Sequence, residues 1–151
     1  MKPLIVLIIV FVVALLSIKI IRDCYDVAFA ARIAMSVMLL FTAIAHFAFS
    51  KGMEMMLPGF IPFKKAVVYF TGLAEIAAAI GLQVPALITT TGWLLILFFL
   101  LILPANIYAA IKKIDYQKAV TEGPGKKYLW FRIPLQIFFI AWTYFAAIYN
   151  N

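Results

Sequence analysis

Five polar side chains interrupt the long hydrophobic segments of this chain. His46, Glu75, Asn106 and Gln136 each stand in a different segment, and Arg132 lies one helical turn before Gln136. In lipid, a polar or ionisable side chain without a partner costs several kcal/mol. Four consecutive segments that carry this cost predict a shared site in the interior of the protein.

His46 and Glu75 are the candidate catalytic residues, because imidazole and carboxyl groups donate and accept protons. A carboxylate deep in a membrane is either paired or protonated, and we expect its partners to be His46 and Arg132. Thr71 stands four residues before Glu75, so it shares the same helix face. One histidine and one glutamate at different depths make a weak metal site, and no metal is assigned.

The composition is that of an integral membrane protein. Hydrophobic residues make up 67% of the 151 residues and charged residues 13%, and the mean hydropathy is +1.09. Ordinary soluble domains are nearer half apolar and a quarter charged. The net charge of +7 does not indicate nucleic acid, since the basic residues stand mostly at segment ends and in one loop. A single cysteine, Cys24, excludes a dithiol enzyme that uses its own cysteines.

The hydrophobic segments predict five transmembrane helices, and strands are excluded because the period-two alternation of a membrane barrel is missing. The helices are expected over residues 3–18, 33–49, 66–82, 86–111 and 128–149. The first forms an N-terminal segment, residues 1–24, and the other four form a membrane domain, residues 25–151.

Two connections are treated separately. Residues 52–62 are rich in methionine but broken by Pro58, Gly59 and Pro62. They are expected to lie at the membrane interface or to dip back as a lid over a lipophilic ligand. The loop 112–127 is expected to be polar and solvent-facing, without a site of its own.

Lysine and arginine predict the orientation. With five spans, the N-terminus, residues 50–65 and residues 112–127 share one side, which holds nine lysines. The opposite side offers Lys19, Arg22 and Arg32, partly offset by Asp23 and Asp26. The lysine-rich side is expected in the cytoplasm, which puts the N-terminus inside and the C-terminus outside.

Depth along the helices places the polar side chains within one leaflet. His46, Asn106, Arg132 and Gln136 lie toward the cytoplasmic ends, and Glu75 lies roughly 15 Å deep, ten residues after Lys65. If these helices face one another, the ligand-binding residues His46, Thr71, Glu75, Asn106, Arg132 and Gln136 line a pocket that opens toward the cytoplasm. In the alternative interpretation, Asn106 and Gln136 only join helices, and Arg132 extends to the headgroups.

From Arg32 onward the chain resembles the DoxX-like family of small bacterial membrane proteins. The matching pieces come in order: AHF at 45–47, MMLPGFIP at 55–62, VYFTGLAE at 68–75, PANIY at 104–108 and RIPLQ at 132–136. The resemblance implies a four-helix transmembrane bundle in the bacterial cytoplasmic membrane, here preceded by one extra helix. Some members of that family look associated with membrane oxidoreductases or quinone reduction, and similar animal proteins act as receptor-assembly chaperones.

Three functions follow as hypotheses. The first is a redox-associated membrane subunit that binds a quinone-like or other lipophilic ligand, such as a quinone or a lipid. No intrinsic cofactor is expected. Its electrons would come from a membrane or peripheral oxidoreductase partner. The second is a non-catalytic assembly factor or interaction module, and the third is an acid–base isomerase of a lipophilic substrate. The residues leave catalysis by this chain alone undecided.

Overall fold

A computed structural model describes residues 2–123 and 125–149, and the regular elements in that part of the chain are helices. They are α1 (Lys2–Arg22), α2 (Val27–Ala48), α3 (Ser50–Met55), α4 (Lys64–Gly81), η1 (Pro85–Leu87), α5 (Ile88–Ile111), η2 (Gly125–Tyr128), α6 (Leu129–Tyr144) and the π-helix η3 (Phe145–Tyr149). An isolated β-bridge joins Asp115 and Val120 in the loop after α5. Of the predicted segments, Pro124 in this loop and residues 150–151 of the second domain lie outside the described residues.

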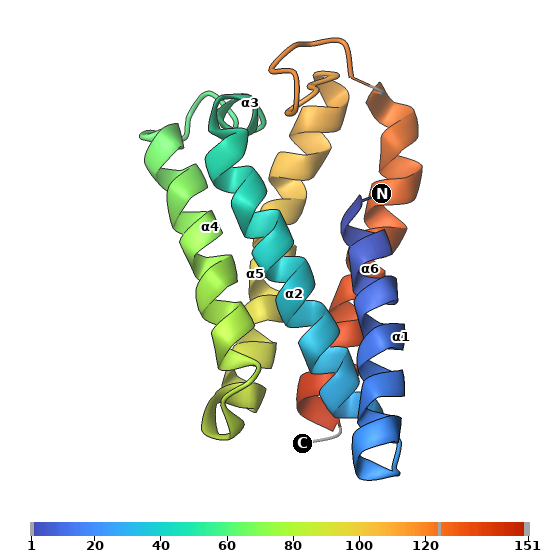
Figure 1. Cartoon of the computed structure of the whole chain (residues 1–151). Coiled ribbons are helices and arrows are strands. Elements are labelled where there is room, and N and C mark those ends of the chain that lie inside the picture. Colours follow the sequence, from blue (N-terminus) through green and yellow to red (C-terminus); the bar gives the residue numbers. More distant parts are fainter. Residues whose placement is uncertain (1, 124, 150–151) are drawn as a thin grey trace.

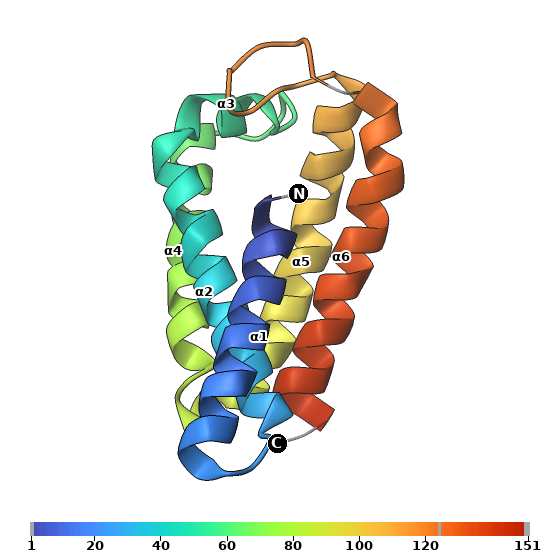
Figure 2. The ribbon, with the colours of Figure 1, turned by 45° about the vertical axis from the view of Figure 1, so that its right-hand side comes forward.

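The long helices run up and down beside one another (Figure 1). In Figure 2, α2 and α4 lie on one side, α5 and α6 on the other, and α1 in front. One end of the bundle carries α3 and the connections after α3 and α5, and the other end carries the turns before α2 and α5. Residues 50–65 and the described residues of 112–127 therefore lie at the same end of the bundle, as predicted, whereas the N-terminal end of α1 begins part way along it.

Four helical stretches are long and apolar enough to cross a membrane. They are Lys2–Arg22, Val27–Ala48, Pro85–Ile111 and Leu129–Tyr149. The chain is thus a helical protein with the character of a multi-pass membrane protein. The fifth long helix, α4, has 18 residues, includes Lys64, Lys65 and Glu75, and runs beside α2.

One predicted helix boundary was wrong, and local capping explains the observed start of that helix. The helix α2 begins at Val27 rather than residue 33, because the Asp26 side chain accepts a hydrogen bond from the Phe29 backbone N–H at 2.9 Å. The first helix continues to Arg22 rather than ending at residue 18. Asp23 follows it with a positive φ of 52°, which stops the helix, and pairs with Lys19 at 2.8 Å.

The helix α1 packs on the bundle. Leu7 is fully buried and belongs to the same core cluster as Met35, Leu39 and Phe139. The ring of Phe11 meets the edge of Trp142 with centroids 5.0 Å apart, and Trp142 Nε1 donates to the Ala31 carbonyl. Aromatic and apolar contacts therefore tie α1, α2 and α6 together.

Candidate functional site

The imidazole of His46 on α2 is held by the backbone and a hydroxyl of α4. Its Nδ1 lies 3.1 Å from the Val68 carbonyl oxygen and 3.0 Å from Thr71 Oγ1. The Thr71 hydroxyl gives its own proton to the Val68 carbonyl at 2.8 Å. Both neighbours of Nδ1 are therefore acceptors, since a carbonyl oxygen only accepts. It follows that Nδ1 carries the ring proton and donates it toward α4.

The other ring nitrogen faces a buried carboxyl group. His46 Nε2 lies 3.5 Å from Glu75 Oε1, and the Glu75 side chain is only 6% exposed. With Nδ1 protonated, one further proton serves Nε2 and Oε1 together. The pair is either imidazolium with carboxylate or imidazole with carboxylic acid, and both arrangements avoid a lone buried charge. This geometry is suited to taking up and releasing one proton.

One carboxyl oxygen of this pair is left over. Among the residues that the structure describes, Glu75 Oε2 has no hydrogen-bond partner, although it is buried. Buried polar atoms are nearly always paired in folded proteins, so an unpaired one calls for a ligand, a water or a proton. Glu75 thus keeps an atom free for a bound group.

A glycine allows α2 and α4 to approach closely beside His46. A Cβ atom on Gly72 would lie 2.9 Å from His46 Cβ and 3.3 Å from the Phe47 ring. The Phe47 ring stacks on Tyr69 of α4 with centroids 5.6 Å apart. Small residues permit such close helix packing in membranes. Here the close contact brings α2 near enough to α4 for the His46 side chain to lie beside Glu75.

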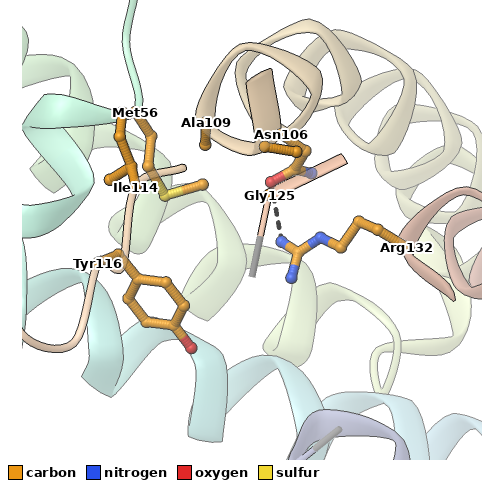
Figure 3. A pocket seen from close by; sticks show the side chains of 8 residues that line it. Met56, Asn106, Ala109, Ile114, Tyr116, Gly125 and Arg132 are labelled. Atoms are coloured by element: carbon orange, nitrogen blue, oxygen red, sulfur yellow. Dashed lines mark hydrogen bonds between the residues drawn. The ribbon is translucent and has the colours of Figure 1, made fainter. Parts of the chain in front are cut away.

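Asn106 and Arg132 form a second polar group, between α5 and α6. Arg132 Nη2 donates to Asn106 Oδ1 at 2.8 Å (Figure 3). Asn106 is 6% exposed, and its Nδ2 has no hydrogen-bond partner within the described part of the chain. The arginine fixes the oxygen side of the amide, so the NH₂ group is the part that remains available.

These two side chains line a small pocket of about 30 Å³. The rest of its wall is mainly apolar and comprises Met56, Ala109, Ala110, Ile114, Tyr116 and Gly125. Figure 3 shows Met56 and Tyr116 across from the Asn106–Arg132 hydrogen bond. The wall therefore combines α5, α6, the end of α3 and the loop after α5.

The described part of the loop 112–127 contributes three residues to the pocket wall. Its backbone at Tyr116 would clash with a Cβ on Gly52, so α3 and this loop touch directly. The Tyr116 ring also meets Phe49 edge to face, with centroids 6.2 Å apart. Much of the described loop is exposed, as expected, and close packing on α3 brings Ile114, Tyr116 and Gly125 to the pocket wall. Nothing in the loop's polar sequence distinguishes these residues.

Gln136 takes part in a helix–helix contact. Its Nε2 donates to the Phe99 carbonyl of α5 at 2.5 Å, and its side chain is buried. The next carbonyl, that of Leu100, has no helical donor because Pro104 lacks a backbone N–H group. Of the two interpretations offered for Gln136, this contact supports the one in which it joins helices.

The predicted single cluster is divided into two by these contacts. His46, Thr71 and Glu75 lie together between α2 and α4, whereas Asn106 and Arg132 lie together between α5 and α6. Glu75 pairs with His46, as expected, and the contact found for Arg132 goes to Asn106 rather than to Glu75. The reason is helix pairing: α2 packs against α4 and α5 against α6 over long stretches, and each polar side chain meets the helix next to it.

Comparison with known proteins identifies one family. Residues 35–147, about three quarters of the chain, match a family model described as a domain of unknown function, DUF8561. The match begins within α2, so α1 lies before it. No curated protein and no solved structure matches the chain.

Proposed function

This chain belongs to the DUF8561 family, and we propose that it is a redox-associated membrane subunit that binds a quinone-like or other lipophilic carbonyl compound. The proposal rests on the His46–Glu75 pair, which holds one exchangeable proton beside an unpaired, buried Glu75 Oε2. Quinone reduction needs a proton donor near a carbonyl oxygen. A carboxyl oxygen without a partner is suited to that role.

The chain's own residues would bind the ligand and move the proton. In this proposal the one proton shared by His46 Nε2 and the Glu75 carboxyl group is carried by Glu75 Oε2, which donates it to the carbonyl oxygen of the ligand. Thr71 and the Val68 carbonyl hold the imidazole in place through Nδ1. The electrons come from a membrane or peripheral oxidoreductase partner, since a chain with one cysteine has no dithiol of its own.

The proposal includes the membrane in which the protein lies and the orientation of its termini. We place the protein in the bacterial cytoplasmic membrane, N-terminus inside and C-terminus outside, with α4 as the fifth span. The lysine-rich end that carries α3 and the loop after α5 supports this orientation. The resemblance to the DoxX-like family, which includes the segment with Thr71 and Glu75, supports a redox association.

The experiment compares Glu75→Gln with Glu122→Gln. Glu122 is an exposed loop residue, so its substitution makes the same chemical change away from the pair. Protein extracted with its native lipids should carry a quinone-like compound detectable by mass spectrometry. We expect Glu75→Gln to lower the occupancy of this compound roughly tenfold, because the hydrogen bond from the carboxyl group to the ligand is lost. Glu122→Gln should leave the occupancy unchanged.

Two outcomes would contradict ligand binding at Glu75. If the wild-type protein carries no such compound, or if both variants retain it equally, the proposal fails. The buried polar residues would then serve to join helices, as Gln136 does, which is the arrangement expected of a non-catalytic assembly factor.

A further inference from the structure

Asn106 lines the pocket and carries a buried donor atom, Nδ2, for which the described residues supply no acceptor. Arg132 donates to Asn106 Oδ1, which leaves Nδ2 directed away from the arginine with two N–H groups to satisfy. Asn106 is more than nine-tenths buried, so bulk water does not reach this atom. A group that fills the pocket must therefore supply acceptor oxygens.

The charge around the pocket favours an anion. Arg132 lines it, and no acidic residue is among its lining residues within the described part of the chain. Lys113 runs past Gly125 of the pocket wall, since a Cβ there would lie 3.3 Å from Lys113 Cγ. Asp115 stands between the lining residues Ile114 and Tyr116, and its carboxylate accepts hydrogen bonds from the backbone N–H groups of Gln117 and Lys118.

The size of the pocket separates this site from the proposed quinone site. A volume of about 30 Å³ has room for about two water-sized oxygens of a bound group, whereas drug-sized ligands need roughly 300 Å³ or more. Asn106 also lies six residues before Lys112 at the end of α5, or about 9 Å along the helix.

We propose that Asn106 and Arg132 bind a phosphate-class oxyanion in this pocket, beneath α3 and the loop 112–123. Asn106 Nδ2 donates to one oxygen, and the Arg132 guanidinium supplies the positive charge. The same chemistry fits the headgroup of an anionic phospholipid and free inorganic phosphate. This proposal stands independently of the quinone hypothesis.

Two measurements on the full chain distinguish the sources. In the first, inorganic phosphate is added to protein in a nonionic detergent, and Tm is compared with that in chloride of equal ionic strength. In the second, protein from vesicles of phosphatidylglycerol and phosphatidylcholine is examined by native mass spectrometry for retained phosphatidylglycerol. A rise in Tm supports free phosphate as ligand, and selective retention supports a lipid headgroup. Absence of both in the wild-type protein overturns the proposal.

The matched variants are Asn106→Asp and Gln117→Glu. Asn106→Asp keeps an acceptor for Arg132 but replaces the Nδ2 donor with a carboxylate oxygen, so binding should weaken at least about tenfold. Gln117→Glu adds the same charge at an exposed position of the same end and should leave binding within about twofold. Equal binding by wild type and Asn106→Asp places the anion elsewhere and overturns the proposal. If Asn106→Asp loses its helical circular dichroism, Asn106→Leu removes the donor without adding charge and is subject to the same criterion.

Discussion

At the scale of single residues, two kinds of polar group stand out among the buried and part-buried side chains. Ser36, Gln136 and Trp142 each donate to a main-chain carbonyl of a neighbouring helix, at Ala79, Phe99 and Ala31. Glu75 and Asn106 each contact one partner and keep a second buried polar atom unpaired, in the part of the chain that is described. The first kind stabilises helix packing, and the second kind is where a ligand gains most from binding.

A prediction at this scale concerns the hydrogen bond between Thr71 and His46. Thr71→Val keeps the shape of the side chain but removes the hydroxyl that joins His46 Nδ1 and the Val68 carbonyl. We expect it to lower the free energy of unfolding in mixed micelles by about 1 kcal/mol. Thr42 bonds only within its own helix, to the Met38 and Leu39 carbonyls, so Thr42→Val should cost less than half as much. Equal costs would contradict a special role for Thr71.

At the scale of elements, the distance between α2 and α4 decides whether His46 reaches Glu75. Gly72 faces His46 and Phe47 at this contact, and a side chain there would push the helices apart. Toward the other end of α4, Ser36 Oγ donates to the Ala79 carbonyl and Gln83 Nε2 donates to Ser36 Oγ. The two helices are thus in contact both beside the acid–base pair and nearer the C-terminal end of α4.

We therefore predict that Gly72→Ala destabilises the protein by about 1–3 kcal/mol, because an added methyl group overpacks this contact. The control is Gly59→Ala in the connection between α3 and α4, where an added Cβ meets no atom within 4 Å. This change should be neutral or slightly stabilising. Unfolding in mixed micelles checks both variants, and a tolerated Gly72→Ala would show that the α2–α4 contact is loose.

At the scale of the whole molecule, the two ends differ in charge. Lysines gather at the end with α3 and the loop after α5, including Lys51, Lys64, Lys112, Lys113 and Lys118. The opposite end holds Lys19, Arg22 and Arg32, with Asp23 and Asp26 nearby. Arg32 is also occupied, because its Nη1 donates to the Ala146 carbonyl at 3.1 Å. The proposed orientation follows from this difference.

Cys24 provides a built-in test of that orientation. It is exposed and lies in the turn between α1 and α2, at the end poor in lysine. In spheroplasts, a membrane-impermeant maleimide should label Cys24 without permeabilisation. A single cysteine at the other end, Lys118→Cys in a Cys24→Ser background, should react only after permeabilisation. The reverse pattern would overturn the orientation and place the Asn106 pocket on the outer side.

The sequence by itself determined the helical membrane class, and it singled out three of the buried polar residues, Glu75, Asn106 and Gln136. These properties follow from local composition, since an apolar run long enough to cross lipid must satisfy its backbone as a helix. Only the tertiary structure decided which polar side chains meet. Helix pairing joins His46, Thr71 and Glu75 in one place and Asn106 with Arg132 in another. Close packing of α3 brings Tyr116 and Gly125 to the pocket beside Asn106 and Arg132. Contacts between distant segments depend on which faces pack together, and that choice is made by the whole core rather than by any one segment.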